Sequence, residues 1–306
     1  MRHLLTLEGM PRATLEGLLD AAQALRPNAL RGNDRQPLRG ITCANLFFEP
    51  STRTRSSFQL AAQRLGADVL NFDADRSSTR KGETLVDTLR NLEAMGASLF
   101  VVRHAEDGAV QALAQAAAPG TSIVNAGDGR NAHPTQGLLD MLTIRQHKGA
   151  DFSTLKIVIA GDIRHSRVAR SDIHALRILG ATDIRLAAPS TLLPDEEPTF
   201  AHLARFSDFD AALEGCDVVM MLRLQRERMD EGLVESLESY YRDWGLSPQR
   251  LRHAAPDAIV LHPGPMNRGV EIADAVADGP QSAILEQVSN GVAVRMAVLE
   301  MLGIGD

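Results

Sequence analysis

Short apolar runs alternate along the chain with stretches in which apolar residues recur every three or four positions. Strand-like runs in the first half lie at residues 41–48, 67–72, 97–102 and 121–126. Helical patterns separate these runs at residues 56–65, 83–95 and 108–118, and another precedes them at 14–25. This alternation predicts right-handed crossovers and a mostly parallel sheet that helices cover on both faces.

The alternation restarts after a helical pattern at residues 133–147 and a polar stretch at 148–153. Strand-like runs follow at residues 155–161, 183–188, 217–222 and 258–262, and a long helical pattern covers 282–302. We therefore predict an α/β fold of two doubly wound parallel-sheet domains joined by linking helices. The first domain is expected over residues 1–148, with a C-terminal helix of about 285–306 packing back on it, and the second over 149–284.

The composition of the chain is that of a globular protein and disfavours several other classes of protein. The chain has 306 residues, of which 44% are hydrophobic and 23% charged, which suits two domains of about 150 residues. Its net charge of −7 opposes nucleic-acid binding, because general nucleic-acid binders usually carry the opposite charge. Cys43 and Cys216 are far apart and match no metal-ligand spacing, so we expect neither a disulfide framework nor a structural zinc site.

Neither export nor membrane insertion fits the hydropathy of the chain. The N-terminal stretch carries Glu8, Arg12 and Glu16 where a signal peptide needs unbroken apolar residues. The longest charge-free stretch, residues 109–127, contains Pro, Gly, Gln and Asn, which a spanning helix of about 20 apolar residues would not. We therefore expect a cytoplasmic protein without a membrane partner.

The most informative motif is Ser51-Thr52-Arg53-Thr54-Arg55, which follows a predicted strand and opens a predicted helix. A helix start presents unpaired backbone N–H groups and a partial positive charge. Hydroxyl and guanidinium donors added there make a site for a phosphate dianion without a metal. Helix capping followed by solvated arginines is the alternative, and the density of donors disfavours it. No P-loop pattern and no complete dinucleotide-binding fingerprint occurs in the sequence.

Further polar residues follow other predicted strands, where open α/β sheets bind ligands. His133 and Gln136 are three residues apart at a helix start, so both side chains can face one ligand, although His133 alone would suit a loop cap. Arg103 comes just after a strand, where ligands bind in this architecture, and Arg167 and Arg223 hold the same kind of position in the second half. These last two arginines suggest binding of a small dicarboxylate or amino acid. Lys81, in a polar loop, needs no explanation beyond solvation when taken in isolation.

Seven motifs, in this order, closely resemble those of the transcarbamoylase family: FFEPSTRTRSSF, SSTRKGET, VVRH, NAHPTQGLLD, GDIRHSRVARS, RLQRER and LHPGPMNRG. The resemblance runs from about residue 2 to the C-terminus. The S-T-R-T-R and H-P-T-Q motifs are typical of the whole family. The last motif has no cysteine, which favours the aspartate-specific members; a transcarbamoylase for another amino acid, such as ornithine, is the alternative.

The resemblance implies transfer of the carbamoyl group of carbamoyl phosphate to the amine of L-aspartate, an early step of pyrimidine biosynthesis, with no metal or organic cofactor. It assigns carbamoyl phosphate to Ser51, Thr52, Arg53, Thr54, Arg103, His133, Gln136, Gly264 and Pro265. It assigns aspartate to Lys81, Arg167, Arg223 and Gln225. The catalytic residues are expected to be Arg53, Thr54, Lys81, Arg103 and His133.

The resemblance also implies an assembly. In this family the loop matching residues 77–81 reaches into the active site of a neighbouring subunit, so we expect a homotrimer with shared active sites. The loop is short, and either Ser77 or Ser78 is expected to contact phosphate. Some relatives join a zinc-containing regulatory chain and others a dihydroorotase-like chain; the LHPGPMNRG form favours the second.

Overall fold

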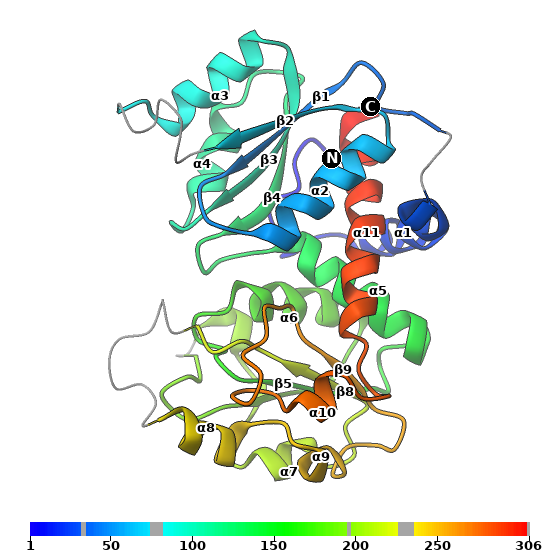
Figure 1. Cartoon of the computed structure of the whole chain (residues 1–306), viewed down its shortest axis with the longest axis vertical. Helices are drawn as coiled ribbons and strands as arrows, with labels where there is room; N and C mark the ends of the chain where they lie inside the picture. The colour runs from blue at the N-terminus through cyan, green and yellow to red at the C-terminus, as the bar shows by residue number, and fades with distance from the viewer. Residues whose placement is uncertain (32–34, 74–81, 195–196, 226–235, 305–306) are drawn as a thin grey trace. The chain divides into compact units, whose positions relative to one another are not determined.

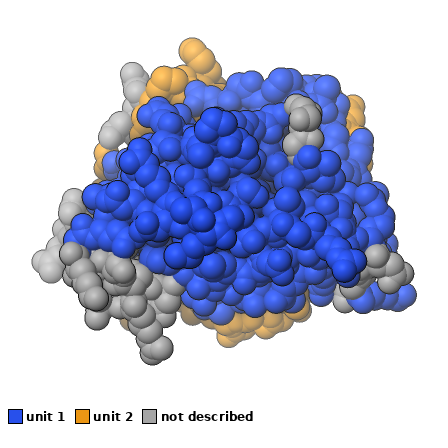
Figure 2. All heavy atoms as spheres, turned by 90° about the horizontal axis from the view of Figure 1, so that it is seen from above, with its two compact units in different colours: residues 1–142, 288–306 blue, residues 143–287 orange. Residues whose placement is uncertain are grey.

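The computed structural model describes residues 1–31, 35–73, 82–194, 197–225 and 236–304. The chain divides into two units, drawn in different colours in Figure 2. Unit 1 comprises Met1–Leu142 and Val288–Asp306, and unit 2 comprises Thr143–Gln287. Among the helices that the structure describes, none combines the length and the apolar character needed to cross a bilayer.

Unit 1 is built on a four-stranded sheet in which every pairing is parallel. Its strands, in the spatial order β2-β1-β3-β4, are β1 (Thr42–Phe47), β2 (Asp68–Asp73), β3 (Ala97–His104) and β4 (Ser122–Asp128). The chain therefore steps from β1 to one side and then crosses to the other side for β3. That reversal between β1 and β3 is the place where parallel sheets of this kind bind ligands, at the carboxyl ends of the strands.

Helices cover both faces of this sheet (Figure 1). The helices of unit 1 are α1 (Arg12–Arg31), α2 (Thr52–Arg64), α3 (Leu85–Ala94), α4 (Ala109–Ala116), α5 (Pro134–Lys148) and α11 (Ile284–Ile304), and the boundary between the units falls within α5 and α11. Leu89 of α3 and Leu113 of α4 pack with Leu46 and Phe100 of the strands in one buried cluster. On the other face, the Ser122 hydroxyl donates to the carbonyl of Leu302, which ties α11 to the sheet.

Unit 2 repeats the architecture on a five-stranded parallel sheet. The strands, in the order β7-β6-β5-β8-β9, are β5 (Lys156–Ala160), β6 (Asp183–Ala187), β7 (Ala204–Phe206), β8 (Val218–Met221) and β9 (Ile259–Leu261). The order of the strands reverses between β5 and β8, which marks the carboxyl ends of these two strands as the ligand-binding edge of this unit.

The helices of unit 2 are α6 (Arg167–Leu179), η3 (Pro198–Phe200), α7 (Phe209–Leu213), α8 (Leu237–Trp244), α9 (Pro248–Leu251) and α10 (Asp274–Ala277). In Figure 1, α6 lies on one side of the sheet and α7 and α9 on the other. Phe209 and Leu251 of these two helices pack with Val219 and Val260 in the buried core of the unit.

The predicted fold class is confirmed, since both units are parallel-sheet α/β structures. Each predicted strand corresponds to an observed one. Two details differ. Helix α2 begins at Thr52, inside the donor-rich motif, rather than at residue 56. The short edge strand β7 was not predicted, because only one of its three residues, Phe206, is a large apolar side chain and none is fully buried.

Candidate functional site

The donor-rich motif forms the first turn of α2, directly after β1. Ser51 is the N-cap, with extended backbone angles (φ −162°, ψ 94°), and its side chain makes no capping hydrogen bond. Thr52 and Arg53 are exposed, whereas Thr54 is buried. The hydroxyl of Ser51 and the first N–H groups of the helix are therefore donors at one accessible helix start, as an anion site requires.

Arg103, near the end of β3, lies beside this motif. The register of the sheet places Arg103 opposite Phe47, and the carbonyl of Arg103 accepts a hydrogen bond of 2.9 Å from the N–H of Phe48. Its guanidinium Nη2 is 3.1 Å from Oε1 of Glu49, and its side chain is 12% exposed. Residues more than fifty positions apart in the sequence are thus adjacent because β1 and β3 pair directly.

The third group follows β4. The loop after this strand is closed by a 3.0 Å hydrogen bond from the N–H of Asp128 to the carbonyl of Ala132. The carbonyl of His133 then accepts from the N–H groups of Gln136 (2.9 Å) and Gly137 (3.2 Å), so the first turn of α5 begins there. The His133 and Gln136 side chains are buried at this start. The carboxyl ends of three neighbouring strands of unit 1 therefore carry the three predicted groups.

In unit 2 the predicted residues follow β5 and β8, which pair directly. Arg167 is buried in the first turn of α6, and Arg223 is half-buried just after β8. Gly161 follows β5 with a φ of +119°, and a side chain there would lie 2.5 Å from the carbonyl oxygen of Leu222. Only glycine permits this close approach of the two segments.

Asp162 joins these two segments, and the sequence analysis did not select it. Its carboxylate is 2.8 Å from Nδ1 of His165 and accepts from the N–H of Gln225 at 3.3 Å. The Gln225 amide donates in turn to the carbonyl of His165 at 3.2 Å. Burial raises the pKa of Asp162, and the hydrogen bonds from His165 and Gln225 oppose that rise. An acidic residue directly after a buried strand is the signal that could have identified it.

The buried pair of His262 and Glu271 accepts hydrogen bonds from the backbone of the turn that contains Gly264 and Pro265. His262 Nε2 is 3.2 Å from Oε1 of Glu271, and neither side chain is exposed. Nδ1 of His262 accepts from the N–H of Gly264 at 2.8 Å, and Oε1 of Glu271 accepts from the N–H of Asn267 at 2.5 Å. The Asn267 amide donates to the carbonyl of Leu224 at 3.3 Å, which connects the turn with the segment that carries Arg223 and Gln225.

Family models match almost the whole chain. The carbamoyl-phosphate-binding domain of aspartate/ornithine carbamoyltransferases matches residues 2–146, and the aspartate/ornithine-binding domain of the same enzymes matches residues 153–302. The chain belongs to the aspartate/ornithine carbamoyltransferase family. The motif after β1 and the buried polar residues at the other strand ends thus lie within the two domains by which this family is recognised.

Curated relatives of the chain are named as aspartate carbamoyltransferases. The aspartate carbamoyltransferase catalytic subunits of Stenotrophomonas maltophilia (strain R551-3) and Xanthomonas campestris pv. campestris (strain B100) are each 68% identical to the chain. These alignments cover 99% of the chain and 96% of each relative. The similarity therefore extends across both units of the chain.

Solved structures of both branches of the family resemble the chain. The aspartate transcarbamoylase of Trypanosoma cruzi, in complex with carbamoyl phosphate and aspartate, superposes with a TM-score of 0.87 at 32% identity, over 98% of this chain and 96% of that one. The ornithine carbamoyltransferase of Thermus thermophilus gives 0.86 at 26% identity, over 99% of both chains. Because the two TM-scores are nearly equal, the fold does not distinguish aspartate from ornithine, whereas sequence identity does.

The structure does not describe three of the residues for which the sequence predicts a role. Lys81, Ser77 and Ser78 lie outside the described residues, so their roles stay predictions. In the part of the chain that the structure describes, no group of three or more His, Cys, Asp or Glu side chains could hold a metal ion.

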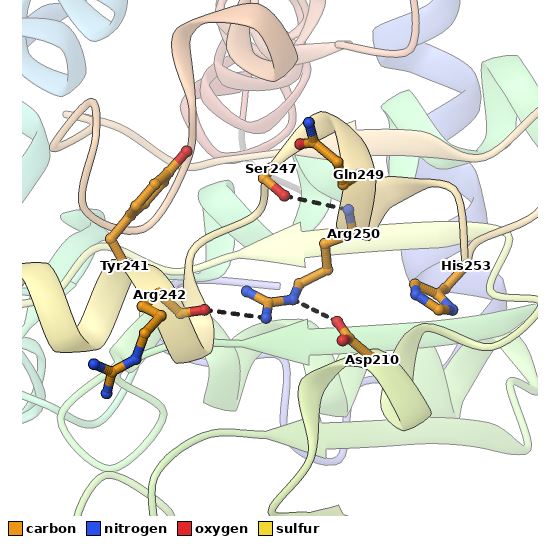
Figure 3. Close-up of a pocket in the computed structure, with 7 residues that line it drawn as sticks. All are labelled: Asp210, Tyr241, Arg242, Ser247, Gln249, Arg250 and His253. Atoms are coloured by element: carbon orange, nitrogen blue, oxygen red, sulfur yellow. Dashed lines mark hydrogen bonds and ion pairs between the residues drawn. The ribbon is translucent and has the colours of Figure 1, made fainter.

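A separate cavity of about 220 Å³ lies in unit 2 (Figure 3). It is lined by residues of α7, α8, α9 and their flanks: Asp210, Tyr241, Arg242, Ser247, Gln249, Arg250 and His253. Arg250 donates to Asp210 at 2.5 Å and to the carbonyl of Gly245 at 2.7 Å, and it stacks over the ring of Phe209. Arg250 and Asp210 are therefore paired with each other, and none of the predicted site residues lines the cavity.

Proposed function

We propose that the chain is an aspartate carbamoyltransferase, which converts carbamoyl phosphate and L-aspartate into N-carbamoyl-L-aspartate and phosphate in the cytoplasm, early in pyrimidine biosynthesis. The observation that carries this proposal is the 68% identity, over 99% of the chain, to curated aspartate carbamoyltransferase catalytic subunits. The ornithine enzyme among the similar structures is only 26% identical.

Unit 1 binds carbamoyl phosphate in this proposal. The phosphate sits at the start of α2, on Ser51, Thr52, Arg53 and Thr54, where N–H groups, hydroxyls and a guanidinium converge on one helix terminus. Arg103, His133 and Gln136 of this unit hold the carbamoyl group, and the resemblance to the family adds Gly264 and Pro265, which belong to the sequence of unit 2. Burial of His133 and Gln136 supports this role, because a hydrogen bond in a site that excludes water is stronger than an exposed one.

Unit 2 binds aspartate. Arg167, Arg223 and Gln225 follow the two strands at which the order of the sheet reverses, and guanidinium groups match carboxylates in shape and charge. The Asp162 network supports this assignment, since it holds the backbone and the amide of Gln225 in one conformation. Lys81, contributed by a neighbouring subunit of a homotrimer, completes the aspartate site and assists catalysis.

The reaction needs charge stabilisation more than acid–base residues. The uncharged amine of aspartate attacks the carbonyl carbon, and Thr54, Arg103 and His133 donate to the oxyanion that forms. The bond from that carbon to the phosphate oxygen then breaks, and phosphate leaves with the proton of the amine, stabilised by Arg53 and Lys81. One preorganised oxyanion donor contributes about 3–4 kcal/mol to such a transition state, and holding two anionic substrates together contributes further.

The direct test is a comparison of acceptor amino acids. Purified chain with carbamoyl phosphate is expected to release phosphate when L-aspartate is added, and not when L-ornithine replaces it. The physical reason is charge: two arginines in unit 2 match the second carboxylate of aspartate and would repel the ammonium group of ornithine. Turnover of ornithine at a rate equal to that of aspartate would contradict the proposal.

Arg223 is expected to govern affinity for aspartate. We predict that Arg223→Ala raises the KM for aspartate roughly 10- to 100-fold, because a charge-assisted hydrogen bond to a carboxylate is lost, and changes the KM for carbamoyl phosphate little. Arg242→Ala, which removes an exposed arginine of the same unit, serves as the control. Steady-state kinetics with each substrate varied in turn distinguish the cases; an equal rise in both KM values would instead indicate a structural role for Arg223.

A further inference from the structure

The side-chain amide of Gln136 is held by Asp140, the last residue of the NAHPTQGLLD motif, to which the sequence analysis assigned no role. Nε2 of Gln136 donates to Oδ1 and Oδ2 of Asp140, at 3.0 and 3.2 Å. The two residues are one helical turn apart on α5, which brings their side chains to the same face. Because a carboxylate only accepts hydrogen bonds, the NH2 end of the Gln136 amide has to face Asp140, and the amide oxygen therefore faces the opposite way.

Asp140 is 1% exposed, and a carboxylate buried to this extent requires a compensating charge. Arg295 of α11, which is 4% exposed, supplies that charge within unit 1. Burial lowers the pKa of Arg295 to about 9, with Asp140 opposing the shift and Arg103 adding to it. The two buried side chains, of opposite charge, therefore interact electrostatically within unit 1.

The Arg295 guanidinium is packed between the ring of Phe58 and the backbone at Gly291. It lies over the ring of Phe58, with 5.0 Å between Cζ and the ring centroid. Phe58 belongs to α2, the helix whose first turn carries Ser51–Thr54. A side chain at Gly291 would lie 2.5 Å from Nη1 of Arg295, so glycine at this position leaves room for the guanidinium. Arg295 thus packs against the helix of the donor-rich motif and interacts electrostatically with a residue of the helix of Gln136.

We propose that Asp140, charge-balanced by Arg295, is a positioning residue that orients the Gln136 amide so that its oxygen accepts a hydrogen bond from the NH2 of the carbamoyl group. The inference rests on the proposed function, because the proposed function makes carbamoyl phosphate the ligand whose NH2 group meets the Gln136 oxygen. Without a fixed orientation, a glutamine amide presents either its oxygen or its NH2 group, and only the oxygen pairs with a carbamoyl NH2.

The test is Asp140→Asn, which keeps the size of the side chain. Asparagine can offer either an oxygen or an NH2 group to Gln136, so the preference for one amide orientation is lost. The KM for carbamoyl phosphate is expected to rise roughly 10- to 100-fold, the range for a buried hydrogen-bonding group left without its partner, while the KM for aspartate changes little. Asp87→Asn, the same chemical change at an exposed position of α3 in the same unit, is the control and should leave both KM values unchanged.

Acetyl phosphate distinguishes positioning from a general loss of structure. It has the phosphate and carbonyl of carbamoyl phosphate but a methyl group in place of NH2, so it cannot use the Gln136 oxygen. Its inhibition constant against carbamoyl phosphate is expected to be the same for Asp140→Asn and the wild type. A parallel weakening of acetyl phosphate and carbamoyl phosphate binding would overturn the proposal.

A double-variant cycle tests whether Asp140 acts through Gln136. In a Gln136→Ala background, Asp140→Asn should add no further increase to the KM for carbamoyl phosphate; an undiminished increase would contradict the proposal.

If Asp140→Asn does not fold, Arg295→Lys and Arg295→Met replace it. The lysine variant, which keeps the charge, should retain affinity for carbamoyl phosphate better than the methionine variant, and equal affinities would overturn the proposal. If the wild-type chain does not transfer the carbamoyl group to aspartate, the proposed function is refuted. If the wild type is active but the variants do not behave as described, only the role of Asp140 is refuted.

Discussion

Arg53→Ala is expected to lose carbamoyl transfer by roughly 10²- to 10³-fold while remaining folded, which corresponds to about 3–4 kcal/mol of transition-state stabilisation. Arg53 is exposed in the first turn of α2, where alanine is a good helix former, so the truncation removes no buried packing. In the proposed mechanism its guanidinium stabilises the phosphate as it leaves, so kcat should fall together with affinity for carbamoyl phosphate. Steady-state kinetics and a thermal melt measure the two effects separately.

Arg64→Ala is the matched control for this variant. Arg64 lies in the last turn of the same helix, so its truncation removes the same charge from α2 at the end opposite the proposed phosphate site. Arg64→Ala should retain activity close to that of the wild type. Normal turnover of carbamoyl phosphate by Arg53→Ala would show that the donor-rich motif does not bind phosphate, and the assignment of unit 1 would have to be withdrawn.

Lys81→Ala and His133→Ala are each expected to be nearly inactive as homotrimers, yet to recover activity when mixed and reassembled. The reason is the proposed sharing of sites, in which His133 comes from one chain and Lys81 from its neighbour in a closed cyclic trimer. In a random equimolar mixture, about one quarter of such sites would draw both residues unmutated from two chains. Activity of the reassembled mixture, measured against the wild type taken through the same procedure, provides the test.

Two controls make this hybrid experiment decisive. The wild-type chain is expected to sediment at the mass of three chains, and native mass spectrometry of variants of distinguishable mass should show hybrids after mixing. Reassembly of each variant with itself should remain inactive. Confirmed hybrids without recovered activity would contradict the shared site, and the loop of residues 77–81 would then act within its own subunit.

Much of the secondary structure could be predicted from the sequence because it depends on local patterns. Strands such as β1 and β4 are buried along almost their whole length and contain short clusters of apolar residues, which contrast with the helical spacing around them. The short edge strand β7 escaped prediction, because an exposed edge imposes no such pattern. The start of α2 was placed too late, because its first turn is polar and lacks the apolar periodicity used to recognise helices.

The sequence by itself determined the two α/β halves, the donor-rich start of α2 and the resemblance to transcarbamoylases, because each of these depends on residues close together in the chain. Only the tertiary structure decided that β1 pairs with β3 and β5 with β8, which fixes the strand ends that lie side by side. It also identified four buried charged residues, Asp162, Glu271, Asp140 and Arg295. The partners of Asp162 and Arg295 include residues far away in the sequence, Gln225 and Asp140 respectively. A buried charge is stabilised by its partners, and the fold decides which charges are buried: neither the burial of Asp140 nor its electrostatic interaction with Arg295 follows from the spacing of residues along the chain.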